Sequence, residues 1–307
     1  MQKLASPRIV GVGGVFIDDI VLPSGQTYMG QLGGGVVHAL MGAAVWGERP
    51  GIVAPIGHNL PAEAGQRLSA ALDTRGLVKL AIPQIRAWQL FEEDGSRREL
   101  YRVQETDPFI NGLQPSQFPA EYDDAAGIYL LQGFEGIKAW RDRLKGLVLW
   151  EPLQQVMVKG ARDAIGEVLG NYPIDIVSPN LLEAQTVYGE ESPEVLVRAM
   201  LNDGARIAAL RMGEAGSMIG DRESGGIHVI PAIPVKTIVD QTGAGNTYCG
   251  GLLWGIVSGM ELKAAATVGA VSASFCLEQI GVLDPTQIEA TERDRRFEQL
   301  FRQTLID

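Results

Sequence analysis

The sequence predicts an α/β fold: a doubly wound, mainly parallel sheet with helices on both faces, and a small β excursion beside the main core. Two observations predict it. Short apolar runs of strand length alternate along the 307 residues with stretches of helical periodicity, an order typical of parallel sheets covered by helices. Glycine accounts for 38 residues, and because glycine serves where backbone turns sharply or approaches a ligand closely, its excess favours a ligand-binding cleft. We expect one domain over residues 1–307.

Strands and helices of ordinary length alternate in the first part of the chain. The helix expected at 36–46 ends at Gly47, a residue suited to a helix C-terminus. The helix expected at 61–73 begins with proline, which the first helical turn tolerates. The expected strands lie at 9–12, 15–22 and 51–56.

A β-hairpin is predicted from residues 87–91 and 97–103, with its turn at Asp94 and Gly95. Polar and apolar residues alternate in this hairpin, so one of its faces is expected to meet solvent. The small β-sheet that results is expected to come from residues 15–33 and 78–108.

The rest of the chain repeats the strand and helix alternation. The expected strands lie at 127–131, 146–150, 174–177 and 207–212, with further short strands in 219–235. The expected helices lie at 135–145, 155–169, 180–188, 193–202, 244–258, 262–276 and 285–304.

Charge and cysteine content exclude several function classes. The chain has 26 Lys and Arg residues against 37 Asp and Glu residues, and the net charge of −11 argues against nucleic acid or an anionic membrane as the main partner. Cys249 and Cys276 form no CxxC motif, so no zinc-type cluster is expected. The first residues do not resemble a secretory signal, and no run of about 18 apolar residues occurs, so we expect a cytoplasmic protein.

The segment most suited to chemistry is Gly243-Ala244-Gly245 at the start of an expected helix. Side-chain-free backbone there leaves several N–H groups unpaired, and the helix dipole adds partial positive charge. Such an end binds a phosphate or a developing negative charge. The alternative is that small residues only let the helix pack closely on the sheet.

Two further segments have both a functional and a structural interpretation. Gly34 and Gly35, in a run of three glycines, lie one turn before His38 and indicate either close approach to a ligand or a flexible hinge. Asn180 and Glu183 have the spacing of a helix capping box, and the same side chains also suit a metal–phosphate centre. In open α/β sheets ligands bind beyond the carboxyl ends of the strands, where these residues are expected.

Two nucleotide-binding motifs are excluded. The glycines at 11, 13 and 14 begin like a dinucleotide fingerprint, but Phe16 takes the place of its last glycine and extended sequence follows. The chain also has no GxxxxGK[ST] sequence, so it is not a P-loop protein.

The segments above, in this order, resemble the ribokinase-like (PfkB-type) carbohydrate kinase family over nearly the whole chain. Residues 240–246 resemble the family signature Asp-Thr-Thr-Gly-Ala-Gly-Asp, and residues 33–47 resemble its Gly-Gly signature and helix. Asn180 and Glu183 match Asn-x-x-Glu, and residues 210–216 resemble Thr-Leu-Gly-x-x-Gly. The 85–103 segment, which contains the hairpin, is similar to the family's β lid.

The resemblance implies an ATP-dependent kinase that phosphorylates a hydroxyl of a sugar, nucleoside or similar small molecule, uses Mg²⁺, and forms a homodimer through the lid. The implied roles are an anion hole of Gly243, Ala244 and Gly245 with Asn246 at the catalytic position; substrate binding by Asp18, Gly34, Gly35 and His38; nucleotide binding by Asn180, Arg211, Gly213 and Gly216; Mg²⁺ organised through water by Asn180 and Glu183; and a monovalent cation such as K⁺ at Asp240 and Thr242.

Asn246 departs from the family, which has its catalytic aspartate there. An amide is not basic near neutral pH, so it cannot take the proton of the attacking hydroxyl. Three interpretations follow: Asn246 orients the hydroxyl while the proton leaves to phosphate or solvent; Asp240 or Glu151 acts as the base; or the chain is a pseudokinase that binds nucleotide or metabolite as a sensor or partner protein. His38, Phe16 and Arg211 also replace family residues, which leaves the substrate open.

Overall fold

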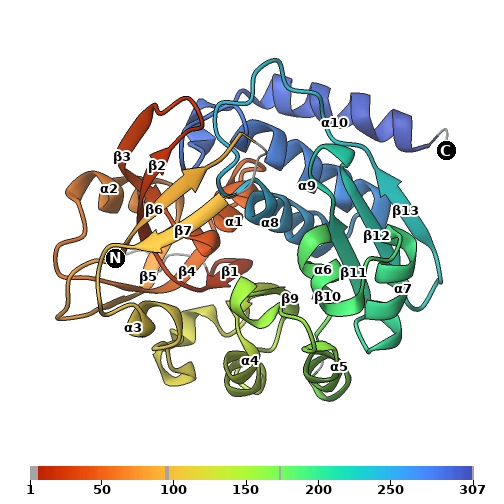
Figure 1. Ribbon diagram of the computed structural model, residues 1–307, viewed down its shortest axis with the longest axis horizontal. Coiled ribbons are helices and arrows are strands. Elements are labelled where there is room, and N and C mark those ends of the chain that lie inside the picture. The colour runs from red at the N-terminus through yellow and green to blue at the C-terminus, as the bar shows by residue number, and fades with distance from the viewer. Residues whose placement is uncertain (1–5, 94–96, 173, 306–307) are drawn as a thin grey trace.

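The computed structural model describes residues 6–93, 97–172 and 174–305, and Figure 1 shows their arrangement. A large sheet runs through the molecule in the order β13-β12-β11-β10-β9-β8-β1-β4-β5. Its pairs from β11 to β5 are parallel, and only β12 and β13 add antiparallel pairs at one edge. The strand bounds are β1 Ile9–Val12, β4 Gly51–Ile56, β5 Asp73–Lys79, β8 Gly127–Gln132, β9 Leu147–Pro152, β10 Ile176–Val177, β11 Ile207–Arg211, β12 Ser217–Asp221 and β13 Ile227–Ile230.

Helices cover both faces of this sheet, as expected. One buried apolar cluster packs α1, α2, α8, α9 and α10 on one face, and a second packs α4 to α7 on the other. The helix bounds are α1 Gly35–Ala44, α2 Ala62–Ala71, α3 Asp107–Ile110, α4 Phe134–Arg141, α5 Arg162–Asn171, α6 Leu181–Tyr188, α7 Pro193–Asn202, α8 Ala244–Val257, α9 Leu262–Cys276 and α10 Ala290–Thr304. Within the described ranges, no helix has the length and apolar content needed to span a membrane.

The sheet has a topological switch point at β1, which pairs in parallel with β4 on one side and with β8 on the other. The chain builds outward from β1 in both directions, so the loops after β1 and β8 diverge and leave a crevice at the carboxyl ends of the strands. This crevice is where the fold positions a ligand site.

A smaller, four-stranded sheet lies beside the main one, at the left of Figure 1. Its order is β3-β2-β6-β7, with β2 and β6 parallel and the outer pairs antiparallel. The buried Asp19 of β2 links the strands of this small sheet. Its carboxylate pairs with Arg86 and Arg102 and accepts the backbone N–H of Gly30. The strand bounds are β2 Phe16–Val21, β3 Thr27–Gly33, β6 Arg86–Phe91 and β7 Arg97–Tyr101.

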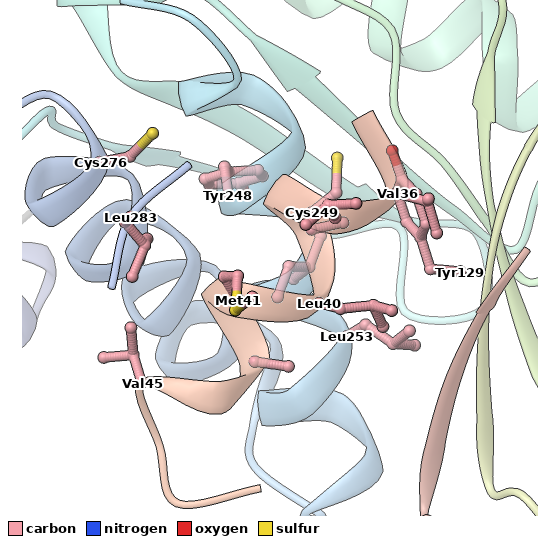
Figure 2. Close-up of a cluster of buried hydrophobic side chains, with 14 of the residues drawn as sticks. Val36, Leu40, Met41, Val45, Tyr129, Tyr248, Cys249, Leu253, Cys276 and Leu283 are labelled. Atoms are coloured by element: carbon pink, nitrogen blue, oxygen red, sulfur yellow. The ribbon is translucent and has the colours of Figure 1, made fainter. Parts of the chain in front are cut away.

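Small residues bring α1 and α8 into close contact. A Cβ atom added to Gly250 of α8 would lie 1.6 Å from the Ala39 carbonyl oxygen, and one added to Gly42 of α1 would lie 2.2 Å from that of Thr247. Figure 2 shows the side chains around this contact, where Val36, Leu40 and Met41 of α1 meet residues from α8. The packing fixes the N-termini of α1 and α8 next to each other at the crevice.

Three boundaries differ from expectation. Residues 73–79 form an edge strand of the large sheet, which their polar sequence concealed, so the smaller sheet takes less of 78–108 than expected. Helix α5 begins at Arg162 rather than at 155, because residues 154–156 form one 3₁₀ turn and Gly160 has a φ of 88°. The C-terminal helix begins at Ala290, after a separate turn over Pro285–Gln287. The expected turn at Asp94 and Gly95 lies outside the described residues.

Candidate active site

A cavity of about 1240 Å³ lies between the small sheet and the carboxyl ends of the large sheet. Its volume exceeds the usual range for one small-molecule pocket, about 300–1,000 Å³, and suits two ligands side by side. The residues predicted from sequence that line it are Asp18, Gly34, Gly35, His38, Asn180, Glu183, Arg211, Gly213, Gly216, Thr242, Gly243, Ala244, Gly245 and Asn246. Asp240 is buried beneath this set.

The first turn of α8 lines the cavity. Gly243 is the N-cap and has a φ of 72°, a left-handed conformation that favours glycine. A Cβ atom at Gly243 would lie 2.0 Å from His38 Nδ1, and one at Gly245 would lie 2.2 Å from Arg211 Nη1. Larger residues at either position would therefore displace the side chains that surround the helix end.

Asn246, in the first turn of α8, joins a buried polar network. Its amide nitrogen donates to Glu151 Oε1 at 2.9 Å and to the Tyr129 hydroxyl at 3.2 Å. The Tyr129 hydroxyl in turn donates to Glu151 Oε2 at 2.6 Å. Of the two alternative bases considered from sequence, the structure brings Glu151 next to Asn246.

Arg211, at the end of β11, carries the positive charge of the site. Its Nη1 lies 2.8 Å from Glu151 Oε1, and its Nη2 lies 3.8 Å from Glu183 Oε2 and donates to the Ser178 carbonyl at 2.9 Å. Burial lowers the pKa of Arg211, but the carboxylates of Glu151 and Glu183 outweigh it and raise that pKa above its ordinary value. The guanidinium is therefore charged, and it links the two carboxylates.

Asn180 and Glu183 form the capping box expected at the start of α6. Asn180 Oδ1 accepts the Glu183 N–H, and Glu183 Oε2 accepts the Asn180 N–H, both at 2.8 Å. Burial raises the pKa of Glu183 despite the nearby Arg211. Within the described ranges, no group of three or more His, Cys, Asp or Glu side chains gathers to hold a metal ion. This donor set does fit Mg²⁺ that arrives on nucleotide phosphates, since such Mg²⁺ needs only one or two protein carboxylates.

Asp18 and His38 lie where the small sheet and α1 meet the cavity. Asp18 Oδ1 accepts Gln89 Nε2 at 3.1 Å, and burial raises the pKa of Asp18 to about 7. Burial lowers the pKa of His38 to about 3, so its ring is neutral near physiological pH. His38 Nε2 has no hydrogen-bond partner among the described residues, which leaves one buried polar atom for a ligand.

Asp240 and Thr242 hold the turn before α8. Asp240 Oδ1 accepts the Thr242 N–H at 2.8 Å and the Thr242 hydroxyl at 2.7 Å, and Asp240 Oδ2 accepts the Gly281 N–H at 2.8 Å. These bonds account for the burial of Asp240 and anchor the loop that carries Gly243.

The sequence did not predict two groups that contribute to the site: Tyr129, buried behind Glu151 and Asn246, and Gln89, which lines the cavity. Tyr129 lies inside the apolar strand β8. The sequence feature that could have identified it is a hydroxyl-bearing side chain in a strand that is expected to be fully buried. Gln89, on β6, donates to both Asp18 and Glu99 and joins the small sheet to the cavity. It sits in a polar, alternating hairpin, where nothing in the sequence distinguishes it from its neighbours.

Comparison with known proteins gives the family. Residues 147–289 match the family described as pfkB family carbohydrate kinase. The cytidine kinase of Thermococcus kodakarensis is 30% identical over 280 residues, which are 89% of this chain and 97% of that protein.

Solved structures share the fold. The nucleoside kinase of Burkholderia thailandensis in complex with inosine has a TM-score of 0.75 at 18% identity, over 96% of this chain and 97% of that chain. An Escherichia coli protein solved with ATP and Mg²⁺ has a TM-score of 0.77 at 17% identity, over 95% and 99%. At these identities the likeness shows the fold alone, whereas the 30% identity over nearly all of both chains shows kinship. This chain belongs to the pfkB family of carbohydrate kinases.

Proposed function

We propose that this chain transfers the γ-phosphoryl group of ATP to a hydroxyl of a nucleoside. The observation that supports this most is one continuous cavity, which joins the N-terminus of α8 and Arg211 to an aromatic and polar compartment beneath the small sheet. A reaction between a nucleotide phosphate and a small acceptor needs both compartments in contact.

The phosphate compartment is built from the first turn of α8 and from Arg211. Unpaired N–H groups at a helix N-terminus bind anions, and here the glycines at 243 and 245 let a phosphate approach the backbone. Preformed dipoles of this kind stabilise charge that develops in a transition state. Asn180 and Glu183 are the residues that would hold nucleotide-bound Mg²⁺, and that ion would neutralise phosphate charge.

The acceptor compartment favours a nucleoside over a bare sugar. Phe16 and Tyr101 meet edge to face with ring centroids 6.2 Å apart, and Phe109 lines the same cavity. Aromatic walls suit a flat base, while Asp18 and the free Nε2 atom of His38 suit hydroxyl groups. The relatedness to a cytidine kinase supports the same substrate class.

In the proposed reaction the acceptor oxygen attacks the γ-phosphorus, the new O–P bond forms, and ADP leaves as the bond to its bridging oxygen breaks. Such transfer depends mainly on alignment and charge stabilisation. The α8 N-terminus and Arg211 stabilise the charge, and Asn246 orients the hydroxyl.

Three features complete the proposal. The small sheet of β3, β2, β6 and β7, as part of one domain over residues 1–307, acts as a lid on the acceptor. Exposed β7, whose Leu100 is 52% exposed, supports a homodimer through the lid, since bare sheet edges are usually covered. Asp240 and Thr242 are proposed to hold a monovalent cation such as K⁺ when one is present.

The test is an acceptor panel for the purified protein with ATP and Mg²⁺, comparing cytidine, uridine, adenosine and inosine with ribose and fructose. We expect ADP release to depend on a nucleoside, with the highest kcat/KM in that class. A higher kcat/KM for a sugar would overturn the substrate class. ATP binding by calorimetry, with no acceptor phosphorylated, would instead identify a pseudokinase.

A further inference from the structure

We propose that Glu151 accepts the proton of the attacking hydroxyl. The general base of this reaction is then the carboxylate at position 151, and the amide that binds it is at position 246. This inference rests on the proposed kinase function. It concerns a residue outside the segments by which the family was recognised.

Geometry carries the first step of the argument. Glu151 lines the cavity at the end of β9, and its Oε1 lies 2.9 Å from the Asn246 amide nitrogen. A hydroxyl aligned by Asn246 therefore lies within one side-chain length of a carboxylate. Asp240, the other carboxylate considered, has both oxygens bound by loop groups.

Asn246 is chemically matched to Glu151. Its amide nitrogen donates to Glu151 and to the Tyr129 hydroxyl, and an aspartate there has no N–H to donate. An aspartate would also place two carboxylates within about 3 Å, where both cannot stay ionised. The amide at 246 is thus the residue that permits a charged Glu151.

The neighbours of Glu151 leave it able to act. An ionised carboxylate has about four lone-pair sites. Among the described residues, the Asn246 amide and Arg211 bind Oε1, the Tyr129 hydroxyl binds Oε2, and the Cys249 thiol also lies within hydrogen-bonding reach of the carboxylate. The Arg211 guanidinium, 2.8 Å away, balances the buried charge, and the carboxylate still lines the cavity, where a substrate hydroxyl can approach it.

The proposed step is balanced. The substrate O–H bond breaks as its oxygen forms the bond to the γ-phosphorus, and the bond from that phosphorus to the bridging oxygen of ADP breaks. The proton passes to Glu151 as a carboxylic acid, which returns it to solvent after the products leave. No oxidant, reductant or further reactant is needed.

The test exchanges the two side chains. Glu151→Gln is expected to lower kcat by about 10²–10⁴, the range for loss of a general base, with the Kd for ATP within twofold of wild type. Asn246→Asp alone is also expected to be slow, because its carboxylate and Glu151 share one proton. The double variant Glu151→Gln/Asn246→Asp restores one amide and one carboxylate, and its kcat is expected to be at least tenfold above that of Glu151→Gln.

Asp73→Asn is the matched control. Asp73 is also buried and also pairs with an arginine and a tyrosine, Arg75 and Tyr122, but it does not line the cavity. This variant is expected to lose stability and keep the wild-type kcat. It separates the loss of a buried ion pair from the loss of a base.

Two results would overturn the proposal: a Glu151→Gln enzyme with wild-type kcat, or an exchanged pair no faster than Glu151→Gln. Should Glu151→Gln fail to fold, the exchanged pair decides alone, since an active one supports the base and an inactive one contradicts it. Wild-type protein that phosphorylates no acceptor would show that the kinase function itself fails.

Discussion

The amide nitrogen of Asn246 donates a 2.9 Å hydrogen bond to the carboxylate of Glu151, across the gap between the start of α8 and the end of β9. This bond joins position 246, the last residue of the segment that resembles the family signature, to a side chain far away in sequence. Two residues that look unrelated in the sequence thus form one polar pair, and the role of the amide at 246 is best understood together with its partner.

Substitution of Gly243 by alanine is expected to lower kcat by about 10²–10³, the cost of losing one backbone donor to a developing charge. The reason is steric, because the new Cβ atom would lie 2.0 Å from His38 Nδ1 at a φ of 72°. Steady-state kinetics measures the loss. Gly65→Ala in α2 is the control: its Cβ atom meets only Leu60 at 3.9 Å, so we expect unchanged kcat and a free energy of unfolding higher by about 0.5–1 kcal/mol. Equal kcat in both variants would contradict the anion-hole assignment.

Asp18 predicts a pH-dependent stability. Its pKa of about 7 in the folded protein exceeds the ordinary aspartate value of 3.8, because burial disfavours its charged form. The folded state therefore binds more protons between these values, and the contribution of Asp18 to stability falls as pH rises from about 4 to 7. Asp18→Asn removes this effect.

Thermal unfolding at several pH values checks this expectation. The Tm of Asp18→Asn minus that of wild type is expected to be larger at pH 8 than at pH 5. The variant is also expected to have a raised KM for the acceptor at pH 8, where wild-type Asp18 is ionised. A Tm difference that does not change with pH would show that burial does not raise the pKa of Asp18.

His38→Ala is expected to raise the KM of the acceptor about 2- to 12-fold, the range for one lost hydrogen bond, and to leave the Kd for ATP unchanged. The buried Nε2 of His38 has no hydrogen-bond partner among the described residues, and His38 lines the cavity. His38→Asn keeps a polar group and is expected to recover part of the loss. A change in the Kd for ATP alone would place His38 with the nucleotide instead.

Asn180 has two roles that a pair of variants separates. Asn180→Ala removes the α6 cap and is expected to lower the free energy of unfolding by about 1 kcal/mol, while Asn180→Ser keeps an N-cap and loses less. If Asn180 also organises Mg²⁺, both variants weaken binding of ATP·Mg²⁺. Urea unfolding and calorimetry measure the two effects, and full recovery of nucleotide affinity in Asn180→Ser would leave Asn180 only its capping role.

The sequence predicted the core of this fold well, because alternating apolar and helical segments mark a parallel sheet directly. Strand β5 was not predicted, because an edge strand with residues such as Asp73 and Arg75 lacks the apolar run that marks central strands. Helix α5 begins later than expected because Gly160 has a left-handed backbone conformation, which separates the preceding 3₁₀ turn from the helix. Local composition does not report such interruptions.

The site was predictable wherever backbone chemistry determines it. Glycines at a helix start and a capping box have local signatures, and Gly243, Asn180 and Glu183 were found from them. The partners of Asn246 were not predictable in the same way. Tyr129 and Glu151 come from neighbouring strands, and only the parallel register of β8 and β9 brings their side chains together.

The most direct test of the kinase assignment is the product analysis of one reaction, with wild-type protein, ATP, Mg²⁺ and cytidine. Mass spectrometry measures the amounts of ADP and of phosphorylated cytidine as the reaction proceeds. We predict that the two accumulate in equal amounts and that omission of cytidine abolishes ADP formation. ADP release without a phosphorylated nucleoside, or its persistence when cytidine is omitted, would contradict the account.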